Sequence, residues 1–561
     1  MDESPASPLP IPGKLQNRSV LPAWWTRYPS RCDWPLLYFM LLIATFFRFR
    51  GLDHAGLWLD EIILAHRAQN SVLELMSEPT KSLHHPAMSI LPFSLFLEVG
   101  LSNYFIRFPS VFFGILSIPV IYKLGRNLFS NSVGLISALL LSISSFHIIY
   151  SQEARSYSMF LFFCLTSFYF FQRGLMTRKV QPWLLYFICT LAGIASHYLM
   201  ILAVLGQVVL MGLVGLGIYL KGDTAARKSW LWQAVHFFSL LAVIGLTQLV
   251  WLNNLTTGLA NTEGGAAKLN LTLIPSLLSE MLTGGSFTQA IFLFLAWAGG
   301  VVAWRINFRN GLLLINWAVF AILSTIISLF IVGQQFHIRH LIWALPPLLI
   351  AAGGGAVSMS AGVYNILRSK LEGDQSRIPY ALISLGVTGL LLFPTIGSNL
   401  IHIRSNTLIK QSWPLGRLQE AVALVTSQAQ SDDLVFAVGL PAQFVKFFAD
   451  PTRQDLIYID EDFFNQSDHP LGLLPHKVSG RWYLFRNSHY YPNVPVQWLR
   501  HLDYQGFNDV LVVHLPNDCT LPDCIQETKT LLQEISEANP DSTLATRASN
   551  VVLGFEVLQI Q

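Results

Sequence analysis

Residues 104–159 read YFIRFPSVFFGILSIPVIYKLGRNLFSNSVGLISALLLSISSFHIIYSQEARSYSM. Two apolar runs, 105–122 and 132–149, flank a short polar turn that carries Lys123 and Arg126. Each run approaches the roughly 20 residues that a helix needs to cross the hydrocarbon core of a bilayer. The stretch therefore predicts two membrane-spanning helices joined by a short basic loop.

The composition of the whole chain points to the same environment. The 561 residues are 52% hydrophobic and only 12% charged, with a mean hydropathy of +0.46. Soluble domains carry about 25% charged residues. The net charge of +3 is too small to indicate a nucleic-acid partner. We therefore interpret the chain as an integral membrane protein.

Further apolar runs predict a polytopic α-helical membrane protein with about eleven transmembrane helices. The candidate segments are 34–50, 105–122, 132–149, 157–172, 182–196, 199–220, 230–252, 286–304, 311–333, 341–363 and 379–397.

The distribution of Lys and Arg predicts the orientation, because short cytoplasmic loops are enriched in both. Residues 1–33 are polar and Pro-rich, show no cleavable signal peptide, and are expected to form a cytoplasmic tail. The loop 51–85 then lies outside, and every later basic loop falls on the cytoplasmic side if 86–100 is a shallow or re-entrant helix. If 86–100 crosses instead, this bias is lost. The basic residues of these loops are Lys123, Arg126, Arg173, Arg178, Lys179, Lys221, Arg227, Lys228, Arg305, Arg309, Arg368, Lys370 and Arg377.

The chain changes character after the predicted membrane domain, 34–397. In 398–561, DDLVFAVG and FNDVLVVHL resemble buried strands, whereas DCIQETKTLLQEISEAN has helical periodicity. We therefore expect an extracytoplasmic α/β domain. Its Cys519 and Cys524 either pair in an oxidising compartment or stay free thiols, and their spacing does not decide between the two.

An acidic pair, Asp60 and Glu61, stands in the predicted first outer loop, within GLWLDEIILAHRAQN. Adjacent residues on a helix point about 100° apart, so one of the two is expected to face a given site. Desolvation at the membrane edge makes a carboxylate a stronger base. Alternatively, Asp60 ligates a divalent cation, or the pair simply stays hydrated at the interface.

Further ionisable residues are predicted at the same outer face. Glu153 and Arg155 stand at the mouth of a helical hairpin, and Arg339 and His340 precede an apolar helix. Arginine binds phosphate bidentately. Alternatively, Glu153 and Arg155 form a local ion pair that stabilises a turn, and Arg339 only anchors the orientation of its helix in the membrane. His85 follows another histidine and lacks the i, i+4 spacing of helical metal ligands. It is interpreted as a proton carrier or a phosphate contact as readily as a ligand.

The order and spacing of these motifs resemble the family 39 glycosyltransferases of the GT-C class, which include protein O-mannosyltransferases and lipid A aminoarabinose transferases. The resemblance covers roughly residues 35–365 and is strongest over 56–160. Besides 104–159, the matching stretches are LWLDEIILA, HHPAMSILPF and HIRHLIWALPPLLIAAG.

The resemblance implies an enzyme that moves a sugar from a polyprenyl-phosphate donor to a lipid, glycan or protein acceptor on the extracytoplasmic side, with inversion. It implies Asp60 as the catalytic carboxylate and Glu61 as its supporting partner. The implied donor-binding residues are His85, Glu153, Arg155, Tyr157, Arg339 and His340.

The chain also departs from the aminoarabinose transferases. There an Arg-Tyr pair follows the acidic pair after one residue, and a Lys precedes the next Pro; here the positions hold Ile63, Leu64 and His85. These departures argue against an aminoarabinose donor and suit a broader bacterial branch of the family 39 glycosyltransferases. The expected location is the bacterial plasma membrane. The alternative hypothesis is a transporter or flippase of a lipid-linked or small solute.

Overall fold

The structure is a computed structural model of the full chain. It describes residues 33–53, 57, 59–69, 86, 89–97, 103–177, 179–222, 224–260, 281–282, 286–332, 338–370 and 380–409, together with six strands between 434 and 559. His85, Cys519, Cys524 and the helix predicted near 524–540 lie outside the described residues.

Each of the predicted apolar segments is largely helical, although 132–149 and 341–363 are each divided between two helices. The long helices are α1 (Asp33–Phe49), α5 (Asn103–Leu128), α6 (Asn131–Ile143), α8 (Tyr157–Met176), α9 (Gln181–Ser196), α10 (Leu199–Leu220), α11 (Thr224–Ala260), α13 (Ser286–Ile306), α14 (Phe308–Val332), α15 (Leu345–Lys370) and α16 (Tyr380–Ile409). Short ones are α2 (Leu59–Arg67), α4 (Leu91–Leu97), α7 (Ser145–Ser151) and the 3₁₀ helix η3 (Ile338–Ala344).

Among the described residues, eight helices are long and apolar enough to cross a membrane, or nine if α6 and α7 form one bent span. Two of the other predicted spans, α1 and α9, have 17 and 16 residues. The multi-pass architecture is therefore established, whereas the number of about eleven crossings stays a prediction.

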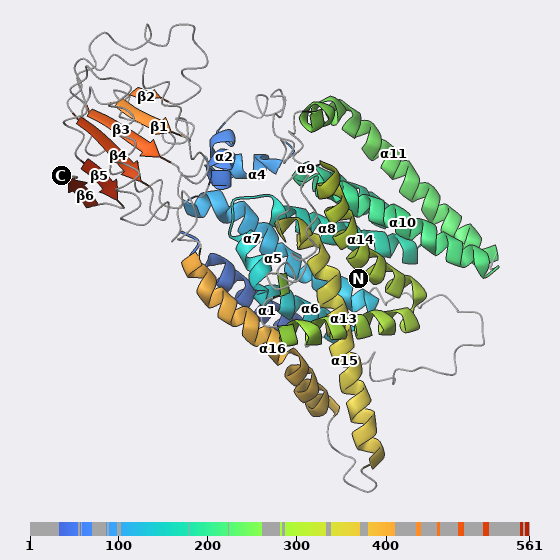
Figure 1. The fold of residues 1–561 in the computed structure, drawn as a ribbon. Helices are drawn as coiled ribbons and strands as arrows, with labels where there is room; N and C mark the ends of the chain where they lie inside the picture. The colour runs from blue at the N-terminus through green and yellow to red at the C-terminus, as the bar shows by residue number, and fades with distance from the viewer. Residues whose placement is uncertain are drawn as a thin grey trace.

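The helical bundle is packed inside and apolar outside. Phe168 of α8 stacks on Trp317 of α14 with ring centroids 3.8 Å apart. Helices α13 and α15 approach closely because Gly299 and Gly355 have no side chain: a Cβ on Gly299 would overlap the carbonyl oxygen of Ala351. Small residues at helix interfaces permit such close approach in membranes. Figure 1 shows the helices gathered into one bundle.

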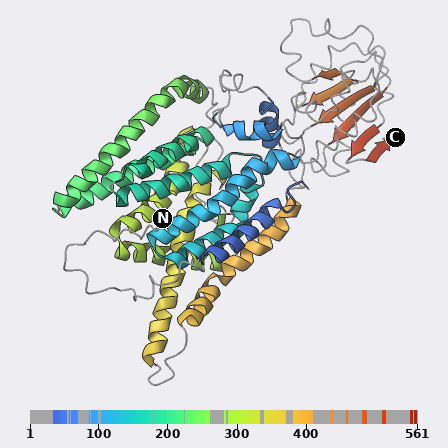
Figure 2. The ribbon, with the colours of Figure 1, turned by 180° about the vertical axis from the view of Figure 1, so that it is seen from behind.

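Within its described residues, the segment predicted to lie shallowly in the membrane contains the short helix α4. Its seven residues span about 10 Å at 1.5 Å per residue, far less than the roughly 30 Å of a hydrocarbon core. Helix α4 packs against α5 and α2, and α2 and α4 lie together at one end of the bundle (Figures 1 and 2). This geometry agrees with a re-entrant or surface helix.

The segment 132–149 was expected to be one helix, but the structure divides it into α6 and α7 with a bend of 59°. Neither Pro nor Gly lies at the break. Instead, the Ser144 hydroxyl accepts a hydrogen bond from the backbone N–H of His147, and Asn399 of α16 accepts one from the N–H of Ser145. Side-chain caps thus start α7 anew and aim its end, Ser151, toward the loop that carries Arg155.

The described strands form one sheet in the order β2-β1-β3-β4-β5-β6. The first five are parallel, and β6 is antiparallel to β5. They are β1 (Leu434–Val438), β2 (Ile457–Ile459), β3 (Arg481–Arg486), β4 (Asp509–His514), β5 (Asn550–Leu553) and β6 (Glu556–Gln559). Strands β1 and β4 are the two that the sequence indicated, while the α/β domain as a whole stays a prediction.

Candidate active site

Asp60, in the first turn of α2, lies between two arginines that come from distant parts of the chain. Its Oδ2 is 3.3 Å from Nη2 of Arg155 and 3.4 Å from Nη1 of Arg339. Nη1 of Arg155 also donates to the backbone oxygen of Asp60 at 3.5 Å. The Asp60 side chain keeps 21% of its surface exposed, so an incoming ligand can reach it. The structure therefore brings one accessible carboxylate and two guanidinium groups together.

Glu61 holds α2 in place. Its carboxylate has no exposed surface, and it accepts hydrogen bonds from Nε and Nη2 of Arg107 at 2.9 and 2.7 Å. One of its oxygens also accepts the backbone N–H of Ala154 at 2.7 Å. A bidentate Arg–carboxylate pair is geometrically specific. Glu61 therefore fixes α2 against α5 and against the loop of Arg155, which leaves Asp60, about 100° further round, to face the arginines.

Arg107 contacts the candidate site, and the sequence analysis did not single it out. It lies at the start of the second turn of α5, and besides its bonds to Glu61 it donates from Nη1 to the backbone oxygen of Leu52 at 2.7 Å. Ionisable residues inside a predicted span are candidates by default, and this signal could have found it.

The loop between α7 and α8 presents Arg155 with its backbone tied down on both sides. The Ser110 hydroxyl of α5 donates to the carbonyl oxygen of Arg155 at 2.9 Å and accepts its N–H at 3.3 Å. Glu153, in the same loop, is buried with 3% of its surface exposed. The side chain of Arg155 thus starts from a fixed point and extends toward Asp60.

An aromatic group lies beneath Arg339. The guanidinium carbon of Arg339 is 5.8 Å from the ring centre of Tyr157, within cation–π distance. The Tyr157 ring in turn lies 6.3 Å from the ring of His340 and 5.2 Å from that of His197. These contacts connect the start of α8 to η3 and to the turn between α9 and α10.

His197, in ASHYL, was not among the predicted site residues. It ends α9, and its Nδ1 accepts the backbone N–H of Leu199 at 3.1 Å. Because Nδ1 is the acceptor, the neutral ring carries its proton on Nε2. A polar residue between two apolar runs on the predicted outer face is the signal that could have identified it.

The other end of α2 faces the same α9–α10 turn. Burial raises the pKa of Tyr198 above its ordinary value, and the positive charge of Arg67 in the last turn of α2 opposes this shift. The last turn of α2 therefore lies within electrostatic range of this turn.

The described part of the site suits an anion. Within the described residues, no group of three or more His, Cys, Asp or Glu side chains is placed to hold a metal ion. The two guanidinium charges beside Asp60 would repel a divalent cation and attract a phosphate. His85, predicted to contact the donor, lies outside the described residues.

Residues 84–251 match the family model described as dolichyl-phosphate-mannose-protein mannosyltransferase. The fold is similar to that of the Archaeoglobus fulgidus oligosaccharyltransferase in its apo form, with a TM-score of 0.50, 12% identity, and coverage of 76% of this chain and 65% of that one. Both findings point to the GT-C glycosyltransferases. The resemblance seen in the sequence motifs is thereby confirmed.

Two further solved structures resemble this chain. Archaeal AglB from A. fulgidus, in complex with an inhibitory peptide and a dolichol-phosphate, has a TM-score of 0.49 and 14% identity, covering 75% of this chain and 65% of that one. Apo ArnT from Cupriavidus metallidurans has a TM-score of 0.48 and 14% identity, covering 80% and 90%. The chain thus spans about two thirds of the oligosaccharyltransferase. No curated protein sequence matches it.

Proposed function

We propose that the protein is a membrane glycosyltransferase that transfers a sugar from a polyprenyl-phosphate donor to an acceptor on the extracytoplasmic side. The observation that carries this proposal is the position of the Asp60 carboxylate between the guanidinium groups of Arg155 and Arg339. The family model supports it, because its description names a dolichyl-phosphate-linked sugar as donor.

The proposed reaction is a single displacement at the anomeric carbon. A carboxylate oxygen of Asp60 takes the proton of the acceptor hydroxyl, and the hydroxyl oxygen attacks C1 of the sugar. The bond between C1 and the phosphate oxygen breaks, and its electron pair stays on the polyprenyl phosphate. Attack opposite the leaving group inverts the anomeric configuration.

The leaving phosphate gains negative charge as the bond breaks, so waiting cations lower the barrier. Arg155 and Arg339 supply that charge, and their planar guanidinium groups match phosphate oxygens bidentately. In the structure both arginines contact Asp60. A donor phosphate that draws the arginines toward its own oxygens frees the Asp60 carboxylate to accept the proton of the acceptor hydroxyl, which couples donor binding to proton abstraction.

The surrounding residues have supporting roles in this proposal. Glu61 positions α2 through Arg107 rather than touching substrate, because its carboxylate is fully buried. Tyr157 supports Arg339 through its ring, and Glu153 and His340 are proposed to contribute to the donor side, because Glu153 lies within electrostatic range of Arg339 and His340 lies beside Tyr157. His85 is proposed to contact the donor phosphate.

The proposed topology follows from the charge distribution. The N-terminal tail lies in the cytoplasm, whereas α2, α4 and the strand region lie on the extracytoplasmic side of a bacterial plasma membrane. The strands do lie beyond the end of the bundle that carries α2 and α4, in both views (Figures 1 and 2). The acceptor, a lipid, glycan or protein, approaches from that side.

The test is transfer by the purified protein in lipid nanodiscs, measured as polyprenyl phosphate released from undecaprenyl-phosphate-linked sugars and dolichyl-phosphate-mannose. Asp60→Asn is expected to lower turnover by about 10²–10⁴-fold, the usual contribution of a general base. Asp53→Asn, the same change at an exposed carboxylate seven residues earlier, is the matched control and keeps wild-type turnover.

Wild-type turnover in folded Asp60→Asn would contradict the proposed mechanism. Movement of intact lipid-linked sugar across the membrane, without any polyprenyl phosphate release, would favour the transporter hypothesis instead.

A further inference from the structure

A buried arginine of α1 caps the end of another helix. Nη1 of Arg48 donates to the carbonyl oxygens of Ala44, in its own helix, and Ser142, at 3.0 and 3.1 Å. Nη2 donates to the carbonyl oxygen of Leu141 at 3.2 Å and to Nδ1 of His147 at 2.7 Å. The last carbonyl groups of a helix have no partner within it. Arg48, which has no exposed surface, therefore satisfies the end of α6 at its break with α7.

The end of α1 leaves carbonyl groups of its own. Gly51 adopts a positive φ of 72°, which ends the helix. In this turn the N–H of Arg50 bonds to the carbonyl oxygen of Phe46, and the N–H of Leu52 to that of Phe49. The carbonyl oxygens of Phe47 and Arg48, which lie between Phe46 and Phe49, accept neither of these two hydrogen bonds.

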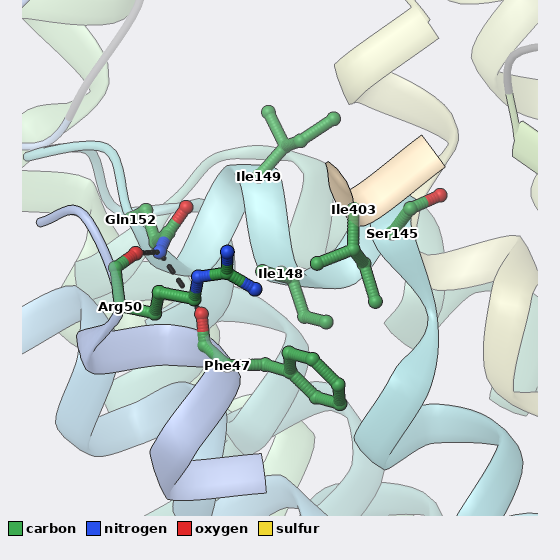
Figure 3. Close-up of a pocket in the computed structure, with 7 residues that line it drawn as sticks. All are labelled: Phe47, Arg50, Ser145, Ile148, Ile149, Gln152 and Ile403. Carbon is green, nitrogen blue, oxygen red and sulfur yellow. Dashed lines mark hydrogen bonds between the residues drawn. The ribbon is translucent and has the colours of Figure 1, made fainter. Parts of the chain in front are cut away.

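Gln152, the residue that ends α7, reaches those groups. Its Nε2 donates to the carbonyl oxygens of Phe47, Arg48 and Arg50 at 3.1, 3.2 and 2.9 Å. Figure 3 shows the Gln152 amide directed at the last turn of α1, beside a small apolar hollow lined by Phe47 and side chains of α7 and α16. Gln152 is 8% exposed, so water does not easily replace these bonds.

The two helices therefore cap each other. Arg48 of α1 donates hydrogen bonds to the last carbonyl groups of α6, at the point where α7 begins. Gln152, at the end of α7, donates hydrogen bonds to the last carbonyl groups of α1. The chain that leaves α1 reaches Asp60 ten residues after Arg50, and Gln152 precedes Arg155 by three residues. Both halves of the Asp60–Arg155 contact thus start from this junction.

We propose that Gln152 and Arg48 are positioning residues for sugar transfer. By reciprocal capping they set the register between the segment that carries Asp60 and the loop that carries Arg155. This inference rests on the proposed function of Asp60. Glutamine suits position 152 because its amide nitrogen donates hydrogen bonds and its side chain is long enough to reach the carbonyl oxygens at the end of α1. Asparagine is one methylene shorter, and an ionised glutamate would place an acceptor against three carbonyl oxygens.

The proposal separates catalysis from donor binding. Loss of the Gln152 bonds lets the α1 end move relative to the Arg155 loop, and a displacement of about 1 Å can cost about 10²-fold in rate. Binding of the lipid phosphate depends on Arg155 and Arg339, which keep their own supports in α5 and at Tyr157. The rate of transfer is therefore expected to fall much more than affinity for the phosphate.

The test compares Gln152→Met, which keeps the length of the side chain and removes its donors, with Gln207→Met. Gln207 is likewise buried, with 0% of its surface exposed, and bonds to Ser167 and Tyr186 in the interior of the bundle, so it controls for loss of a buried glutamine. Three quantities are measured in nanodiscs: amide hydrogen exchange of the peptide 47–62, affinity for undecaprenyl phosphate, and transfer turnover.

Gln152→Met is expected to raise exchange in 47–62, to lower turnover by about 10²-fold, and to change phosphate affinity by less than about 3-fold. Gln207→Met leaves exchange in 47–62 unchanged. Gln152→Asn, the milder variant if the first does not fold, shifts exchange and turnover in the same direction by less.

Unchanged exchange and turnover in Gln152→Met, or equal losses of turnover and phosphate affinity, would overturn the positioning role. Failure of the proposed function looks different, because Asp60→Asn would then keep its turnover while the exchange in Gln152→Met still rises.

Discussion

The Glu61–Arg107 pair makes a quantitative prediction about how α2 is held. Their side chains are 0% and 4% exposed, and Glu61 also accepts the N–H of Ala154. In Glu61→Gln one oxygen still accepts a hydrogen bond, but the new amide group places donors against the donors of Arg107. Breaking one partner of a buried ion pair leaves an uncompensated charge and costs about 3–5 kcal/mol. We expect a loss of stability in that range.

The measurement is reversible unfolding in mixed micelles, arranged as a double-mutant cycle with Arg107→Gln. Because the double variant no longer buries a lone charge, its loss of stability should be smaller than the sum of the two single losses by at least about 1 kcal/mol. Asp53→Asn, an exposed change nearby, should alter the free energy of unfolding by no more than about 0.5 kcal/mol. A cost below about 1 kcal/mol for Glu61→Gln, or an additive cycle, would refute the assignment of Glu61 as the anchor of α2.

Two further predictions concern the phosphate site and the packing of the bundle. Arg339→Gln should weaken undecaprenyl phosphate binding by about 10-fold, the equivalent of one charge-assisted contact. The same change at the exposed Arg305 should leave the measured dissociation constant unchanged. Equal effects of the two changes would contradict the assignment of Arg339 to the phosphate site. Gly299→Ala should lower the free energy of unfolding by about 1–3 kcal/mol, because the new Cβ would overlap the backbone of α15. Gly245→Ala, with open space around it, should be neutral or stabilising. Equal stabilities of the two variants would contradict the close contact between α13 and α15.

The helical segments were predictable because the hydrocarbon core imposes a length and a composition on anything that crosses it. The bend between α6 and α7 was not, since its causes are Ser144 and a side chain of α16 more than 250 residues away. Similarly, Arg339 was expected to precede the apolar helix predicted over 341–363, but it lies inside the 3₁₀ helix η3, which also takes in the start of that segment and leads into α15. Local periodicity contains no information about such long-range caps.

For the candidate site, the sequence indicated which residue types stand at the outer face but not which of them touch. Asp60 and Glu61 look equivalent as adjacent carboxylates, and only the contact of Glu61 with Arg107 in α5 distinguishes a buried, paired carboxylate from a partly exposed one. Gln152 and His197 were passed over because uncharged polar residues beside apolar runs are common. Their importance lies in which carbonyl groups and rings they meet, and this depends on the tertiary fold.

The central claim is that Asp60, Arg155 and Arg339 surround the phosphate of the lipid donor. The most direct measurement is an experimental structure of the protein in nanodiscs with undecaprenyl phosphate bound. The account predicts density for the phosphate within hydrogen-bonding distance of both guanidinium groups, with the Asp60 carboxylate facing the same cavity. A phosphate bound away from both arginines, at a site that Asp60 does not face, would contradict it.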